Sequence, residues 1–284
     1  VIIQLSIHHS DCRNSRIRMV RKLESGIVGH LNCHLLPIMK LKIFFRQANV
    51  ANTVSLTTGT QKNQTYVSVG AVNARGIIQN NDLDRYNFSV RNTTSMLNDK
   101  LTMDLSFMYS NVKEQNMLSQ GEYANPLVPV YLFPRGDDFS KYQYYERYDV
   151  DRNIKTQFWP LKENGLSMQN PYWITNRNMY TNKKDRFLAS GSLKYTITDW
   201  LNVSGRVKLD KETINSEKKM YASTLNVIAE NSDKGAYVQS NKNTSQIYAD
   251  AMLNINKYFY HDTWNLTASL GASLLDLDYK ELNF

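Results

Sequence analysis

The sequence predicts an all-β protein, an antiparallel segment of a transmembrane β-barrel with about eight long strands. Three observations support this: apolar and polar residues alternate over unusually long stretches, short turns alternate with long connections, and the composition is rich in aromatic residues. There are 18 Tyr and 4 Trp but only 6 Pro among 284 residues. Such a composition suits strands and membrane interfaces.

The clearest alternation runs through residues 187–210, which predict one long hairpin closed by a turn at 198–200. Its two arms put apolar and small residues on one face at period two, the period of a strand. These residues are Phe187, Ala189, Gly191, Leu193, Tyr195 and Ile197, then Leu201, Val203, Gly205, Val207 and Leu209. Each arm is about ten or eleven residues long, whereas a soluble strand averages about five or six and a tilted membrane strand needs about nine to eleven.

The opposite face of this hairpin is too charged to form a protein core. It carries Lys194 on the first arm and Arg206, Lys208 and Asp210 on the second. We therefore expect the apolar face to meet lipid and the polar face to line an aqueous lumen.

Hydropathy alone does not detect such a protein. The mean hydropathy is −0.50, and no stretch approaches eighteen consecutive apolar residues, so no transmembrane helix is predicted. Barrel strands escape this test because only alternate residues face lipid.

The same alternation predicts three further hairpins. They pair 53–57 with 67–72, 85–93 with 101–110, and 247–255 with 264–272. Short turns fall near 59–63, 97–100, 198–200 and 257–263, and longer connections near 75–84, 114–183 and 214–243. Outer-membrane barrels have this asymmetry, with short periplasmic turns and long extracellular loops. A soluble sandwich or solenoid also alternates, but it requires neither the loop asymmetry nor the strand length.

Four aromatic residues lie at the expected ends of the membrane-spanning segments. Trp200 and Trp264 are expected at the periplasmic rim, and Tyr86 and Tyr109 near the outer rim. Tyrosine and tryptophan concentrate at both membrane–water interfaces.

Residues 1–43 differ from the rest and are interpreted as an atypical basic leader that is not native barrel sequence, with the barrel segment covering 44–284. The leader holds both cysteines and four of the five histidines, and it contains no Tyr or Trp. Residues 1–50 include eight basic and two acidic residues, a net +6 of the formal +8 of the chain. No aromatic residues are interleaved with these charges, so no nucleic-acid partner is expected. The Cys and His spacings do not match a structural zinc site, and no metal is predicted.

The connection at 114–183 is too long for an ordinary loop of a compact domain, yet its aromatic residues argue against disorder. We expect a folded surface loop. Stacking of sugars on rings would suit Trp159, Tyr172 and Trp173. The alternative is that these side chains pack the loop against itself or against a partner.

No common signature of a phosphate-binding loop, zinc hydrolase, serine hydrolase or dinucleotide fold occurs in the sequence. His261 is the only histidine after residue 43, which disfavours a His-based catalytic triad. We therefore expect neither an enzyme nor a cofactor. The acidic pairs Asp82/Asp84, Asp137/Asp138 and Asp149/Asp151 lack EF-hand spacing and are interpreted as solvated acidic turns.

Several segments resemble the SusC/RagA-type TonB-linked outer-membrane proteins. They are residues 43–70 (IFFRQANVANTVSLTTGTQKNQTYVSVG) followed by ARGII, LDRYNFSVR, NPYW at 170–173, and KYTITDWLNVSGRVKLD at 194–210. The resemblance covers about residues 43–284 and rests on the order of the hairpins. The sequence shows no segment that resembles the signal peptide, the TonB box or the plug of this family. We therefore assign no energy-coupling residue from the resemblance.

The resemblance implies an interior piece of a 22-stranded, plugged barrel in the bacterial cell outer membrane. It implies a nutrient importer that takes up glycan or peptide, is driven by the TonB complex through a plug region, and is capped by a SusD-like surface lipoprotein. Outer-membrane lipids would surround it. A passive pore or structural barrel is the alternative, because it would share every strand feature.

Overall fold

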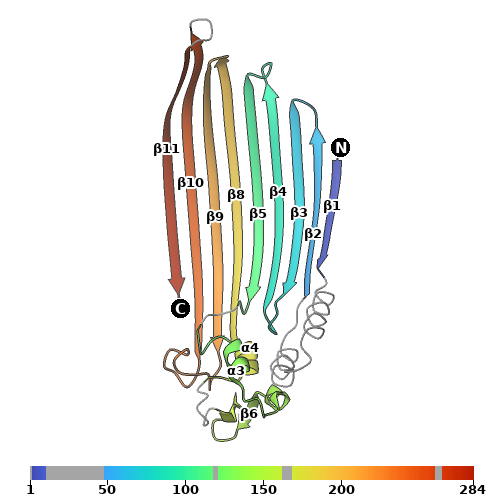
Figure 1. Ribbon diagram of the computed structural model, residues 1–284. Helices are drawn as coiled ribbons and strands as arrows, with labels where there is room; N and C mark the ends of the chain where they lie inside the picture. Colours follow the sequence, from blue (N-terminus) through green and yellow to red (C-terminus); the bar gives the residue numbers. More distant parts are fainter. Residues whose placement is uncertain (1, 11–47, 118–120, 162–167, 260–263) are drawn as a thin grey trace.

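The computed structural model describes residues 2–10, 48–117, 121–161, 168–259 and 264–284, and for 2–10 and Ala48 only the backbone. One long, curved antiparallel sheet dominates these residues (Figure 1). Its strand order is β1-β2-β3-β4-β5-β8-β9-β10-β11, and consecutive strands of the sheet are hydrogen-bonded neighbours. The sheet does not close on itself, so β1 and β11 are its edges.

The strands of the sheet lengthen along the chain. Their bounds are β1 Ile2–Ser10, β2 Ala48–Gly59, β3 Asn63–Arg75, β4 Asp82–Met96, β5 Leu101–Gln115, β8 Asn178–Thr198, β9 Leu201–Met220, β10 Ala236–Phe259 and β11 Trp264–Asn283. The eight predicted strands correspond to β2–β5 and β8–β11, which confirms the fold class. The last four have 20 to 24 residues each.

These last strands continue beyond the segments that the alternation predicted. The connection expected at 214–243 is only 221–235, because β9 and β10 extend into it from both sides. The connection expected at 75–84 is likewise reduced to 76–81. In these extensions polar residues occupy both faces of the sheet, so the period-two signal fades although the strands persist.

The turns at the other end of the sheet are short, as predicted. Asp199 and Trp200 link β8 to β9 after a register shift between Thr196 and Thr198. Leu97, Asn98 and Asp99 all have positive φ in the turn from β4 to β5. Asn and Asp tolerate this left-handed conformation better than most residues.

The connection from β5 to β8 is folded and lies at the opposite end of the sheet from the short turns (Figure 1). It contains the helix α3 (Leu127–Leu132), the short 3₁₀ helix η1 (Phe139–Gln143), the hairpin β6 (Glu146–Asp149) and β7 (Ile154–Gln157), and the helix α4 (Pro171–Arg177). We call residues 116–177 the outer loop. No helix in the described residues is long and apolar enough to cross a membrane.

The basic leader stays a prediction. Ile2–Ser10 pairs antiparallel with β2 as an edge strand, from Ile2 opposite Thr57 to Ser10 opposite Asn49. Residues 11–43 lie outside the described part of the chain.

Candidate functional site: the lumen wall and the outer loop

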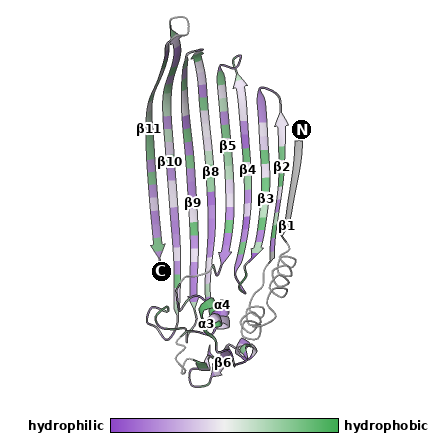
Figure 2. Cartoon of the chain, in the orientation of Figure 1, coloured by the Kyte–Doolittle hydropathy of each residue, from purple (hydrophilic) through white to green (hydrophobic). Residues whose placement is uncertain are grey.

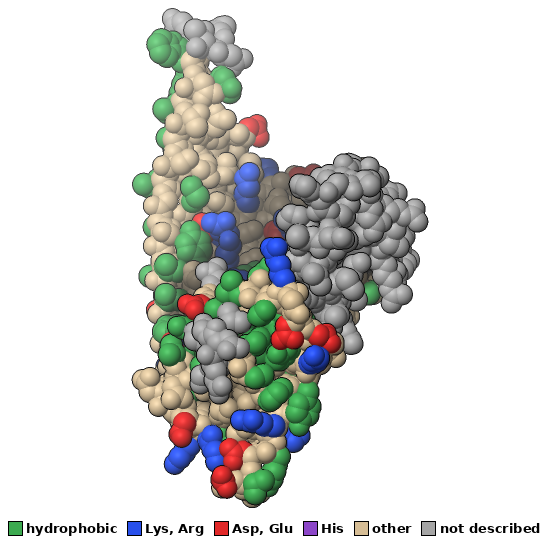
Figure 3. All heavy atoms as spheres, turned by 60° about the horizontal axis from the view of Figure 1, so that its bottom comes forward, with side chains coloured by type: hydrophobic (Ala, Val, Ile, Leu, Met, Phe, Trp, Pro, Cys, Tyr) green, Lys and Arg blue, Asp and Glu red, His purple; other side chains and the backbone are tan. Residues whose placement is uncertain are grey.

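The register of the sheet gathers the apolar residues on one face. Val207 lies opposite Gly191 on β8 and Ala249 on β10, and Leu105 and Leu274 continue the same row on β5 and β11. Along each strand these apolar residues alternate with polar ones (Figure 2). Hydrophobic side chains are scattered over the outer, convex surface, while Lys, Arg, Asp and Glu side chains line the concave side of the sheet (Figure 3).

The polar face carries cross-strand ion pairs. Arg206 Nη2 lies 2.9 Å from Asp250 Oδ2, Arg91 Nη2 2.7 Å from Asp104 Oδ2, and Arg186 Nη2 2.5 Å from Asp210 Oδ2. Ser106 and Ser190 add a hydroxyl–hydroxyl bond of 2.7 Å. Because Arg and Asp balance each other pair by pair, this lumen wall is hydrophilic without favouring one sign of charge at these positions.

The apolar face of β5 and β8–β11 forms a band of nine to eleven residues. It runs over nine residues on β5, β9 and β10, for example from Leu201 to Leu209 on β9, and over eleven on β8 and β11. Nine residues span roughly 27 Å along a strand, and a tilted strand that crosses a bilayer needs about nine to eleven. Beyond the band the same face becomes polar, as at Lys211 on β9 and Asp276 on β11.

The outer edge of this band crosses the sheet obliquely. Its last apolar residues are Tyr86, Tyr109, Phe187, Leu209, Ile247 and Leu274 on β4, β5, β8, β9, β10 and β11. From β4 to β5, from β8 to β9 and from β10 to β11, the last apolar residue lies two residues nearer the short turns than the residue paired with its neighbour. At the other two strand pairs the last apolar residues are directly opposite each other. With a rise of about 3.4 Å per residue and a strand spacing of about 4.8 Å, this slope corresponds to a tilt of about 40°. Strands of outer-membrane barrels tilt by about 35–45°.

The expected rim aromatics lie at the two ends of the band. Tyr86 and Tyr109 are half-exposed at its outer edge, and Tyr109 Oη donates a 2.6 Å hydrogen bond to Asp185. Trp200 and Trp264 lie beside the short turns, and Lys257 Nζ is 4.6 Å from the centre of the Trp200 ring. Their contact with an interface remains a prediction that this placement supports.

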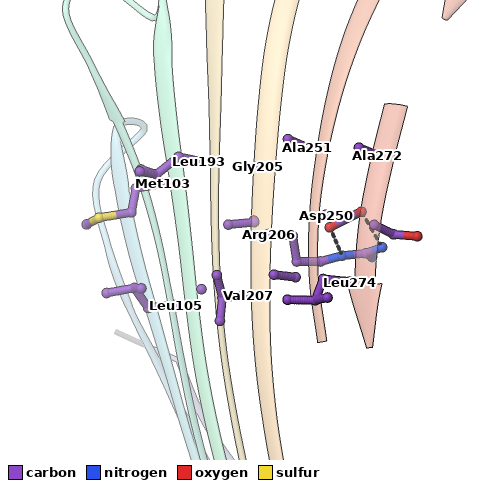
Figure 4. Close-up of a pocket in the computed structure, with 14 residues that line it drawn as sticks. Met103, Leu105, Leu193, Gly205, Arg206, Val207, Asp250, Ala251, Ala272 and Leu274 are labelled. Carbon is purple, nitrogen blue, oxygen red and sulfur yellow. Dashed lines mark hydrogen bonds and ion pairs between the residues drawn. The ribbon is translucent and has the colours of Figure 1, made fainter. Parts of the chain in front are cut away.

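A furrow of about 690 Å³ crosses the apolar face where small residues lie between larger ones (Figure 4). Gly205, Ala251 and Ala272 lie on its floor, flanked by Leu193 and Leu274. Arg206 and Asp250 also contribute to its lining, but their side chains pair with each other. An apolar furrow in this band suits hydrocarbon rather than a polar solute.

The outer loop has its own apolar core. Phe133 packs edge-on against Phe139 and Tyr142, with ring centres 5.0 and 5.1 Å apart, and Tyr142 packs against Trp159 at 5.4 Å. Ile78, from the connection between β3 and β4, is part of the same cluster. The loop is therefore packed onto a neighbouring connection of the sheet.

The segment Asn170–Trp173 joins the outer loop to the connection 221–235. Asn170 caps α4 by accepting from Tyr172 N at 2.9 Å, while its amide donates to the carbonyl of Tyr142 at 2.9 Å. Trp173 Nε1 donates to Thr224 Oγ1 at 3.1 Å. Proline at the first position of a helix and an Asn cap favour this local turn.

Comparisons with known proteins identify the fold. No family model matches the chain, and no curated protein matches it either. The sheet superposes on solved structures described as the RagAB peptide transporter (TM-score 0.61) and the RagAB peptide importer in the "open-open" (0.56) and "closed-closed" (0.55) states. Identity is 13% in each case, and 86% of this chain is covered. The sheet is a segment of a transmembrane β-barrel.

This barrel segment spans 26–30% of the length of the chains that it matches. These structural neighbours are described as transporters or importers. In outer-membrane barrels short turns face the periplasm and long loops face the exterior. The orientation expected from the sequence stays a prediction that the observed asymmetry of the connections supports.

The rings proposed as ligand contacts lie in the core of the outer loop. Trp159, Tyr172 and Trp173 are 7%, 5% and 0% exposed. Burial raises the pKa of Tyr172 to about 12. In this arrangement the three rings pack the loop against itself, which is the alternative role given for them above. A sugar would reach these rings only after the loop had rearranged.

Several residues that organise the outer loop carry no signal in the sequence. Gln169 is fully buried and links the carbonyl of Tyr123 to the backbone N–H of Leu225. Glu146 on β6 binds both Lys155 and Arg177. The sequence singles out Trp159, Tyr172 and Trp173 by their rings and Asn170–Trp173 by a resemblance, but neither Gln169 nor Glu146.

The acidic pairs of the loops serve local structure. Asp138 caps η1 by accepting from Ser140 N at 3.0 Å, and Asp149 accepts from the backbone N–H groups of Asp151 and Arg152. The side-chain bond to Ser140 and then the backbone bond lower the pKa of Asp138. In the described residues, no group of three or more His, Cys, Asp or Glu side chains could hold a metal ion.

Proposed function

We propose that the chain is part of an outer-membrane importer that takes up a polar nutrient, peptide or glycan, through the barrel. The observation that carries this proposal is the superposition of 86% of the chain on solved peptide importers. The superposed part of the chain includes the curved sheet, whose concave face is lined by Arg–Asp pairs.

The outer loop supports an importer more than a structural barrel. A barrel that only spans the membrane does not require a folded connection of about sixty residues with a buried aromatic core. Such ordered loops are usually functional. Tyr131, Tyr144 and Tyr148 remain exposed on it and offer rings to a ligand or to a surface lipoprotein of the SusD type. Energy would come from the TonB complex acting on a plug.

Uptake by living cells tests this proposal. The gene for the full-length protein is deleted, and uptake of fluorescent oligopeptides and oligosaccharides is measured with and without a protonophore. We expect the deletion to abolish uptake of one of the two solutes, and the protonophore to abolish it in the parent strain. Unchanged uptake after deletion would contradict an importer.

A passive pore is the competing function, because a polar lumen also suits diffusion. It predicts uptake that survives the protonophore and a steady conductance of the purified full-length protein in planar bilayers. Co-purification of a surface lipoprotein with the tagged importer is expected only for the first function.

A further inference from the structure

Three lysines on neighbouring strands lie on the outward face of the sheet, just beyond the apolar band. Lys113 on β5 and Lys183 on β8 lie four residues beyond the last apolar residues of their strands, Tyr109 and Phe187. Lys211 on β9 lies two residues beyond Leu209. All three side chains are exposed. We call them the lysine patch.

Lys113 and Lys183 are directly opposite each other in the register of β5 and β8. The Cβ atoms of directly opposite residues are about 5 Å apart, and like charges at such positions destabilise a sheet. A shared anion would remove this repulsion.

No carboxylate of the described residues forms an ion pair with the lysine patch. Asp84, directly opposite Lys113 on β4, instead accepts a hydrogen bond from Asn73 Nδ2 at 2.8 Å and lies 3.3 Å from Arg75 Nη1. Asp185, between Lys183 and the band, accepts hydrogen bonds from Tyr109 Oη at 2.6 Å and Asn111 Nδ2 at 2.7 Å. Glu217, farther out on β9, is bound by Lys219 at 3.0 Å and by Tyr237 at 2.8 Å, and Lys183 adds only a weaker attraction to it.

The height of the lysine patch matches the headgroup layer of a bilayer. With the tilt of about 40°, two and four residues correspond to about 5 and 10 Å above the band. The polar layer on each side of the hydrocarbon core is about 5 to 8 Å thick, and lysine side chains bend toward it. Their face is the one that meets lipid, not the lumen.

We propose that the lysine patch binds the phosphate of an anionic lipid in the outer leaflet. Lys113 and Lys183 hold the phosphate between them. Lys211, about 14 Å from Lys183 in the register, adds positive charge to this face without contacting the phosphate. The bound lipid offsets the repulsion between the opposed lysines. It also holds this part of the sheet at the level of the lipid headgroups. The assignment is independent of which solute crosses the barrel.

Lipid retention by the purified full-length protein tests the proposal. Native mass spectrometry measures how much phosphatidylglycerol stays bound against a background of phosphatidylcholine. The double variant Lys113→Gln/Lys183→Gln is compared with Lys194→Gln/Lys208→Gln, which removes two exposed lysines from the lumen face of β8 and β9. Each lysine near an anionic surface contributes about a fivefold change, so retention should fall roughly 30-fold in the first variant. It should be unchanged in the second.

Equal retention by both variants would overturn the proposal. A second measurement needs no variant: acylation of Lys113 and Lys183 in the reconstituted full-length protein should be slower in phosphatidylglycerol vesicles than in phosphatidylcholine vesicles. Inorganic phosphate added to phosphatidylcholine vesicles should not protect them. Equal protection by inorganic phosphate would show a site for soluble anions and would likewise overturn the lipid assignment.

Discussion

At the scale of single residues, neighbours in sequence face different solvents. Val207 is exposed on the apolar face, whereas Arg206 and Lys208 point to the lumen. The sequence places Arg206 on the face that lines an aqueous lumen. The structure also pairs it with Asp250 and places it 5.5 Å from the ring centre of Tyr248. Truncating Arg206 would therefore leave the carboxylate of Asp250 without its partner. Lys208 is the better residue for testing the lumen face.

Val207→Arg should destabilise the full-length barrel far more than Lys208→Ala. Arginine on the lipid face costs about 2 to 4 kcal/mol at the midplane of the bilayer, whereas removal of an exposed lumen lysine changes stability by less than about 0.5 kcal/mol. Folding into bilayers, followed by heat-modifiable gel mobility and denaturant midpoint, measures the difference. Leu193→Arg and Lys194→Ala on β8 repeat the comparison. Equal costs within both pairs would mean that no lipid meets this face.

At the scale of elements, one carboxylate ties the hairpin β6–β7 to α4. Glu146 Oε1 lies 2.7 Å from Lys155 Nζ, and Glu146 Oε2 lies 2.5 Å from Arg177 Nη2. Burial alone would raise the pKa of Glu146, but its bonds to Lys155 and Arg177 outweigh burial, so the pKa is lowered. The ionised form is the one that holds the two elements together.

The outer loop should consequently loosen in acid. A carboxyl whose pKa is lower in the folded state contributes its full stability above its ordinary pKa of about 4.3. That stability is lost as the pH falls through the lowered value. Limited proteolysis of the folded full-length protein from pH 7 to pH 3 should show the loop opening over this range.

Glu146→Gln should open the loop already at pH 7, at a cost of about 1 to 3 kcal/mol, and flatten the acid response. The matched control is Glu122→Gln, an exposed carboxyl of the same loop that makes no ion pair with the described residues. A Glu146→Gln protein that kept the steep acid response of the parent would assign the transition to another group.

The elements differ in how far the sequence could predict them. Inside the band one face meets lipid and the other water, so the period of two reveals β5 or β9 directly. Above the band both faces are wet, and the outer halves of β9 and β10 lack that signal although their backbone pairing continues. The outer loop was less predictable because its core joins Ile78 to Trp159 and Tyr172 across long sequence separations. The rings are visible in the sequence, but their burial depends on contacts that no local pattern encodes.

At the scale of the whole molecule, the described sheet has an apolar outer surface and two edge strands. β11 is paired only with β10, and its side chains are exposed on both faces, including Leu270, Leu274 and Leu277. Unpaired edges and large apolar patches promote association between chains.

The isolated 284-residue chain should therefore aggregate in water and disperse in detergent. Size-exclusion chromatography and sedimentation velocity, with and without detergent, check this expectation. A compact monomer in detergent-free buffer with a cooperative thermal transition would contradict the membrane assignment.

The oblique band also decides where evolution can change the length of a strand. Deletion of one residue between Leu201 and Leu209 would invert every later side chain, turning a lipid-facing row toward water. In the extensions 211–220 on β9 and 236–245 on β10 most side chains on both faces are polar, so the same deletion can be absorbed by a bulge. Insertions and deletions are thus expected to accumulate in the extensions. The distance of the outer loop from the band can then vary, while the alternation of lipid-facing and lumen-facing residues within the band is preserved.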